Sequence, residues 1–212
     1  MHHSSSIAPS RQLQKKTGKT SKSSEQTVNR RNTPFRLAQF DKILNADTVD
    51  LVELRKVAWN GVPPMYRPRV WQMLLGYLPS NRERRENTIA RKRKEYHDSI
   101  PVYYNISEAD RTTQDGEILR QILVDLPRTC PYTAFFHQAL IQKAMERILY
   151  IWSIRHPASG YVQGMNDLLT PILLVSIQPF APDPLRCDVA SLDPVIMVQL
   201  YLSLLFSNFA MT

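Results

Sequence analysis

A long apolar helix between residues 134 and 156 constrains the fold of this chain more than any other feature. Its apolar side chains recur at intervals of three and four residues, which places them on one face of an α-helix. They are Leu140, Ile141, Ala144, Met145, Ile148, Leu149 and Trp152. His156 and Pro157 end the pattern, because a proline inside a helix removes a backbone hydrogen bond. The sequence predicts that this is the strongest helix of the chain.

The segment before this helix, ILVDLPR at residues 122–128, carries an arginine on a short connection. Leu126 precedes Pro127, and a proline ring disfavours helical geometry at the residue before it, so a helix is predicted to stop ahead of Leu126. Asp125 stands three residues before Arg128, where its carboxylate can orient the guanidinium. We therefore expect Arg128 to be held outward as a preset hydrogen-bond donor.

The segment after the long helix, GYVQGMND at residues 160–167, contains a turn. Gly160 and Gly164 flank Gln163, and glycine permits both a tight turn and a close approach to the backbone. A glutamine carboxamide held there can donate and accept hydrogen bonds. Arg128 and Gln163 can reach the same ligand only at the same end of a helical layer. The long helix therefore has to be followed by a segment that runs back along it.

The other periodic segments also predict helices, and no segment alternates as a strand would, so the body is expected to be all-α. Helices are expected over residues 35–44, over 47–61, over 65–75, over 82–97, from Asp115 onward and over 165–177. The second is expected to be capped by Asp47 or Thr48 and ended by Gly61, and the third to hold Pro68 in its first turn. The helix over 82–97 is expected to face solvent, and the last to have a kink or a re-capped turn at Pro171. Residues 101–104 are expected to be extended. The apolar faces predicted for the earlier helices contain Val49, Val52, Val57 and Trp59, then Trp71 and Leu74, then Ile118, Leu119 and Ile122.

Composition divides the chain into three parts. Residues 1–34 are rich in Ser, Thr, Lys and Arg and have almost no large apolar side chains, which predicts a disordered basic arm. Residues 35–190 are expected to form the helical domain, and residues 191–212 an apolar tail. Residues 1–36 contain eight of the 27 Lys and Arg residues and one acidic residue, Glu25, so they carry +7 of the net charge of +8 of the whole chain. The body is therefore close to neutral, and the net charge says nothing about its partners.

Each end of the chain supports two hypotheses. RRNTP at residues 30–34 is either a phosphorylation site that binds a phospho-dependent partner or part of a solvated basic tail. Residues 194–212 carry no charge and form either a buried or poorly placed helix, which their polar interruptions favour, or a membrane anchor. Cys130 and Cys187 predict reduced thiols, and no signal peptide opens the chain. A cytoplasmic location is expected.

The sequence argues against three classes of site. Gly18-Lys19-Thr20 is not a phosphate-binding loop, because that motif requires a glycine five residues before Gly18, where Leu13 stands. The basic run over 82–97 lacks the interleaved aromatic residues of a nucleic-acid site, so no nucleic-acid partner is expected. The five histidines show no metal-ligand spacing.

Two motifs, I-x-x-D-x-x-R at residues 122–128 and G-Y-x-Q-G-M-N at residues 160–166, together resemble the paired signature of the TBC domain, the helical module of Rab GTPase-activating proteins. Upstream, GVPP at residues 61–64 and RPRVWQMLLG at residues 67–76 resemble the opening helices of the same family. The sequence of residues 128–167 is most similar to the branch called TBC domain family member 22. The resemblance runs from about residue 51 to about residue 188 and implies the N-terminal part of a helical TBC domain.

The resemblance also implies a mechanism with two catalytic residues. Arg128 matches the arginine finger, which stabilises charge on the phosphoryl group in flight, and Gln163 matches the glutamine that orients the attacking water. The residues expected to support them are Asp125, Tyr161, Gly164 and Asn166. A partner GTPase of the Rab family would bring GTP and Mg²⁺, so no cofactor or metal is expected from this chain. The implied place of action is the cytoplasm, with peripheral association at Golgi or endosomal membranes.

In this family the domain continues for many more residues after the second motif than are present in this chain. From about residue 191 the sequence no longer matches the family pattern. We expect the missing helices to leave Leu168, Leu173 and Leu174 uncovered. A second hypothesis is therefore a catalytically inactive, truncated fragment that acts as a protein-interaction or membrane-associated adaptor.

Overall fold

The structure, a computed structural model, describes residues 33–181 and 183–188. Its helices are α2 (Pro34–Leu44), α3 (Leu51–Ala58), α4 (Arg67–Leu74), α5 (Arg85–Ser99), α6 (Thr113–Asp125), α7 (Ala139–Arg155) and α8 (Met165–Ile177). Short 3₁₀ and π-helical turns connect several of them. Within the described ranges no residue lies in a sheet strand, and an isolated bridge joins Thr48 to Asn81. The prediction of an all-α body is confirmed.

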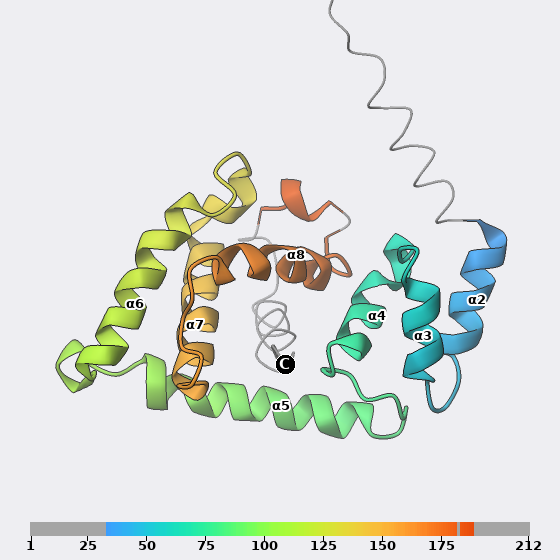
Figure 1. Ribbon diagram of the computed structural model, residues 1–212, viewed down its shortest axis with the longest axis horizontal. Helices are drawn as coiled ribbons and strands as arrows, with labels where there is room; N and C mark the ends of the chain where they lie inside the picture. The colour runs from blue at the N-terminus through green and yellow to red at the C-terminus, as the bar shows by residue number, and fades with distance from the viewer. Residues whose placement is uncertain (1–32, 182, 189–212) are drawn as a thin grey trace, which may run out of the picture.

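Figure 1 shows how these helices are arranged. α5 runs along one edge of the molecule, with α2, α3 and α4 near its N-terminal end and α6 and α7 near its C-terminal end. α8 lies between the two groups and contacts both α4 and α7. One hydrophobic core therefore runs through both groups of helices.

Helix α7 is buried on more than one side. The predicted apolar face is buried except for Leu140, and Tyr150 and Ile151, which lie outside that face, are buried as well. α7 begins later than predicted, because residues Ala134–His137 form a separate 3₁₀ turn and Gln138 is extended. A helix of this kind must be covered by several neighbours, and α6, α8 and the turn after α5 cover it.

Helix α3 begins later than predicted because the residues before it pair with a distant loop. Val49 N donates to Ser80 O over 3.1 Å, beside the bridge from Thr48 to Asn81. The cap is therefore Asp50, whose carboxylate accepts hydrogen bonds from the first backbone N–H groups of the helix. The prediction of Asp47 or Thr48 as the cap was wrong.

The delayed start of α3 also changes its buried face. Val52 and Trp59, predicted as core residues, are exposed, whereas Leu54 is completely buried. In α4, Trp71 and Leu74 are partly buried and pack against the core, as expected.

The region around α5 differs from the prediction at two points. α5 is not purely solvent-facing, because Lys92, Tyr96 and Ser99 are buried. Residues 101–104 are not extended but belong to a π-helical turn, Ile100–Tyr104, that continues α5. Packing of this turn against α7 accounts for the difference, since Tyr104 Oη donates to Glu146 Oε1 over 2.6 Å.

Helix α6 is capped by Thr112 rather than by Asp115. Thr112 Oγ1 accepts a hydrogen bond of 3.1 Å from the backbone N–H of Asp115. At the other end, Leu126 keeps helical angles (φ −57°, ψ −46°) although Pro127 follows it, and a 3₁₀ turn, Leu126–Arg128, continues the helix. The α-helix itself ends at Asp125, ahead of Leu126, as predicted. Leu126 is buried, and that packing outweighs the steric preference against helical angles at this residue.

Helix α8 contains Pro171, as predicted, and shows the expected re-capped turn. Pro171 has no N–H to donate to the carbonyl of Asp167, and Thr170 Oγ1 donates to this carbonyl instead, over 2.9 Å. The acceptor that the proline would leave unsatisfied is therefore bonded within the helix.

The prediction that three leucines of α8 would be uncovered is only partly right. Leu168 is 54% exposed, Leu174 is partly buried, and Leu173 is completely buried. Leu173 lies on the side of α8 that packs into the core, which the sequence motif alone could not distinguish.

The basic arm up to residue 32 and the apolar tail over 191–212 lie outside the described residues, and so do most of the phosphorylation motif and the whole anchor hypothesis. Among the helices of the described ranges, none combines the length and the apolar character needed to cross a bilayer. Cys130 and Cys187 are both free thiols.

The two leucines of α8 with opposite burial provide a test of the core. Leu173→Ala is expected to lower the free energy of unfolding by about 2–5 kcal/mol, because it removes buried methyl groups and leaves a cavity. Leu168→Ala is expected to change it by less than about 0.5 kcal/mol. Urea unfolding followed by far-UV circular dichroism measures both values, and equal losses for the two variants would contradict this packing.

Candidate functional site

The candidate site begins where α6 ends. The 3₁₀ turn Leu126–Arg128 follows Asp125 directly and sets Arg128 at the surface, where its side chain is 56% exposed. The Asp125 side chain is only 6% exposed. Arg128 Nη2 donates to Asp125 Oδ1, so a buried carboxylate holds an exposed guanidinium. Cys130 lies two residues after this turn and has a φ of 45°, in the left-handed region that few non-glycine residues adopt.

The second half of the site is the connection between α7 and α8. Gly160 N donates to His156 O over 2.8 Å and closes the end of α7, and Gly160 and Gly164 both have positive φ (59° and 97°). Gly164 is also the N-cap residue of α8. Gln163 stands between the two glycines with an exposed side chain, which makes no hydrogen bond to another described residue. It is free to bond an external group.

The connection after α7 returns along that helix, as the sequence argument required (Figure 1). α7 has 17 residues and is therefore about 25 Å long. An extended segment gains about 3.3 Å per residue, so residues 156–164 are long enough to come back to the level of the α6 terminus. They do come back, because Tyr161 Oη donates to Asp125 Oδ2 over 2.6 Å.

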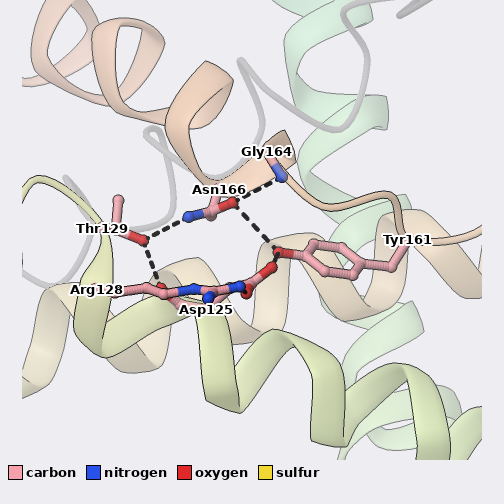
Figure 2. A network of polar contacts seen from close by, with 6 residues as sticks. All are labelled: Asp125, Arg128, Thr129, Tyr161, Gly164 and Asn166. Atoms are coloured by element: carbon pink, nitrogen blue, oxygen red, sulfur yellow. Dashed lines mark hydrogen bonds and ion pairs between the residues drawn. The ribbon is translucent and has the colours of Figure 1, made fainter.

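Figure 2 shows that Asp125 is the point where the two loops meet. One carboxylate oxygen accepts from Arg128 and the other from Tyr161. Burial, together with the hydrogen bond to Asp125, raises the pKa of Tyr161, so the phenol stays protonated and remains a donor at any physiological pH. The buried carboxylate is satisfied on both oxygens, as a buried charge must be.

A second line of hydrogen bonds joins the same two loops (Figure 2). Gly164 N donates to Asn166 Oδ1 over 3.2 Å, and Asn166 Nδ2 donates to Thr129 Oγ1 over 2.8 Å. Thr129 Oγ1 in turn donates to Asp125 O over 3.1 Å. Asn166 and Thr129 are both buried. Two separate hydrogen bonds, one from Tyr161 to Asp125 and one from Asn166 to Thr129, therefore join the turn that carries Arg128 to the turn that carries Gln163.

The structure brings Asp125, Arg128, Tyr161, Gly164 and Asn166 together, as the motifs suggested, and adds Thr129 to them. Sequence reasoning missed Thr129. The signal that could have found it is chemical: a buried Asn166 amide needs a partner for its N–H groups, and a threonine directly after Arg128 can supply one. The catalytic roles of Arg128 and Gln163 stay predictions.

The two predicted catalytic side chains, Arg128 and Gln163, are both exposed. Three large hollows, of about 540 to 780 Å³, are lined by other residues and include neither Arg128 nor Gln163. Close to the two loops along the chain, Val124, Tyr132 and Val162 are exposed apolar side chains. Exposed apolar residues beside fixed polar groups are typical of a surface that binds another protein.

The family model of the Rab-GTPase-TBC domain matches residues 64–181, a range that includes both loops. The chain belongs to this family. It is 47% identical over 160 residues to GTPase-activating protein gyp1 of Schizosaccharomyces pombe, covering 74% of this chain and 31% of the relative. It is 48% identical over 158 residues to human (Homo sapiens) TBC1 domain family member 22B, covering 74% of this chain and 30% of the relative. The chain thus spans about a third of the length of these relatives.

A solved structure agrees with this assignment. The crystal structure of the Ypt/Rab-GAP domain of Gyp1p superposes with a TM-score of 0.71 at 37% identity, covering 81% of this chain and 54% of that chain. The fold described above is therefore the TBC fold over the matched part, and the resemblance inferred from the motifs is confirmed at the level of the family.

The hydroxyl of Thr129 offers a test of the bonds that join the two turns in this TBC domain. Thr129→Val keeps the shape but leaves Asn166 Nδ2 and Asp125 O without their partner, so we expect a loss of about 1–3 kcal/mol in the free energy of unfolding. Thr133→Val is the matched control, because the Thr133 side chain caps nothing, and it should cost less than about 0.5 kcal/mol. Chemical denaturation measures both, and a neutral Thr129→Val would show that the second line of bonds contributes nothing.

Proposed function

We propose that this chain stimulates GTP hydrolysis by a small GTPase of the Rab family. The family assignment supports this, and so do the names of its relatives, which describe GTPase-activating proteins and a Ypt/Rab-GAP domain. The single observation that carries the proposal is the attachment of an exposed Arg128 to a buried carboxylate, on a turn bonded to the turn that bears Gln163. Such fixation is what catalysis by positioning requires.

In this mechanism Arg128 would enter the nucleotide site of the partner and stabilise negative charge on the γ-phosphoryl group. Asp125 accepts from Arg128 Nη2, and the other guanidinium N–H groups are available for phosphate oxygens. Gln163 would orient the attacking water through its carboxamide, which has no partner within the described residues. The partner would supply GTP and Mg²⁺, and the proton balance of the reaction would involve its groups and water.

The exposure of both Arg128 and Gln163 fits this proposal better than it fits a self-contained enzyme. A GTPase that carries its own nucleotide needs a complementary surface rather than a pocket, and Val124, Tyr132 and Val162 provide apolar area beside the two turns. Phosphoryl transfer also needs little covalent chemistry from the activator, so two well-held side chains suffice.

A single-turnover GTP hydrolysis assay over a panel of Rab GTPases tests the proposal. Arg128→Ala should lower the stimulated rate by ~10³ to 10⁵, the range known for arginine fingers, and Gln163→Ala should lower it as well. Arg120→Ala is the matched control. This arginine of α6 is exposed, and among the described residues its ion pair is with Glu117 at the surface, so its loss should leave stimulation unchanged.

The alternative function, a catalytically inactive adaptor, has a specific observation in its favour. The chain corresponds to 54% of the solved domain, and Leu168 of α8 is exposed. If the intact, cooperatively folded chain binds a Rab GTPase without accelerating hydrolysis by any member of the panel, the adaptor function replaces the proposal above.

A further inference from the structure

Two loops that are distant in sequence are joined at the end of the molecule opposite the candidate site. The connection between α2 and α3 pairs with the connection between α4 and α5 through the bridge from Thr48 to Asn81. Arg82 N also donates to Asp47 O over 2.8 Å. Figure 1 places both connections at the α2–α4 end, away from the α6 terminus and the start of α8. This joint forms a fixed frame for the side chains around it.

Three arginines gather on this frame. Arg69 Nη2 donates to Leu44 O over 2.6 Å, which ties α4 to the end of α2. Arg85 Nε and Nη2 donate to Pro79 O and Ser80 O over 3.1 and 2.9 Å. The third, Arg82, is exposed and bonds no other described residue through its side chain. The carbonyl contacts hold two guanidiniums in place and leave most N–H donors of all three unused.

We call these three residues the arginine triad (Arg69, Arg82 and Arg85). Within the described ranges none of the three forms an ion pair. Burial lowers the pKa of Arg69 and of Arg85, and the nearby positive charges lower it further. Glu83 and Glu86 are close in sequence, and the backbone of Asp47 is bonded to that of Arg82. All three acidic residues are exposed, and none forms an ion pair with the triad. Three like charges gathered without an ion-pair partner attract anions.

We propose that the arginine triad binds the phosphorylated headgroup of a membrane lipid. The planar guanidinium matches phosphate oxygens in pairs, and several adjacent guanidiniums can engage more than one phosphoryl group. The headgroup of a phosphatidylinositol phosphate presents several such oxygens at a surface, whereas inorganic phosphate occupies at most part of the triad. This inference concerns a different end of the molecule and does not depend on the proposed GTPase partner.

The surroundings of the triad favour a bilayer as the source of the phosphate. The exposed position of Arg82 opens the site to the outside instead of enclosing it. Val52 lies in the first turn of α3, just after the bridged loop, and is 73% exposed. An exposed apolar residue close along the chain to the bridged loop, together with the cationic side chains of the triad, is a combination found at the interface of a membrane.

Sedimentation with lipid vesicles tests the proposal on the full chain. One set of vesicles contains phosphatidylcholine with phosphatidylinositol phosphate, and the other contains phosphatidylcholine with phosphatidylserine at the same total charge. We expect clear preference for the first set, and displacement by soluble inositol trisphosphate but not by the same concentration of inorganic phosphate. Arg82→Gln should weaken binding about tenfold, the effect of one hydrogen bond to a charged group, and Arg82→Glu should abolish the preference.

Arg84→Gln is the matched control. Arg84 is an exposed neighbour of the triad in the same connection and is not among the charges that lower the pKa of Arg69 or Arg85. Every variant keeps the basic residues of the first 36 positions, so their general attraction to anionic lipid is the same throughout. Equal binding to both vesicle sets, equal losses in Arg82→Gln and Arg84→Gln, or equal displacement by inorganic phosphate would each overturn the proposal.

Discussion

The burial of α7 on more than one side is the constraint on which the rest of this structure depends. A helix that is apolar around most of its circumference cannot lie on the surface, so α6, α8 and the turn after α5 are held against it. The chain enters α7 after one exposed turn and then returns along its length to another. Two segments that are 35 residues apart, at Arg128 and Gln163, are thereby brought to the same end of the helical layer.

At that end the burial of the Asp125 carboxylate, rather than the exposed Arg128, determines which hydrogen bonds must form. Asp125 is buried, and removing a charge from water is costly unless both oxygens are bonded. Arg128 and Tyr161 satisfy them, one from each loop. The same ion pair on an open surface would contribute little. Because Asp125 is buried and bonded by both loops, it fixes the position of the Arg128 guanidinium. The Arg128 side chain nevertheless stays exposed, where a partner can reach it.

The sequence was informative where a pattern was local and misleading where tertiary contact decided. Periodicity predicted α7 and α8, and the two motifs identified Asp125 as the partner of Arg128. They placed Tyr161 and Asn166 only on the loop of Gln163, and the structure adds their bonds to the loop of Arg128. The cap of α3 was misplaced because Thr48 pairs with Asn81, more than thirty residues away. Leu173 was judged uncovered because its packing partners lie elsewhere in the chain. The meeting of Arg69 with Arg85 likewise depends on two loops that no local pattern connects.

The line of bonds from Gly164 to Asp125 has a direction. Each donor in it points the same way, from backbone N–H to amide, from amide to hydroxyl, and from hydroxyl to carbonyl. Turning over the Asn166 amide would set N–H against N–H at Gly164 and leave Thr129 without its donor, so the two bonds of Asn166 are lost together. Hydrogen exchange at the backbone amide of Gly164 should therefore report on the opening of a loop to which Gly164 does not belong, the one that carries Arg128.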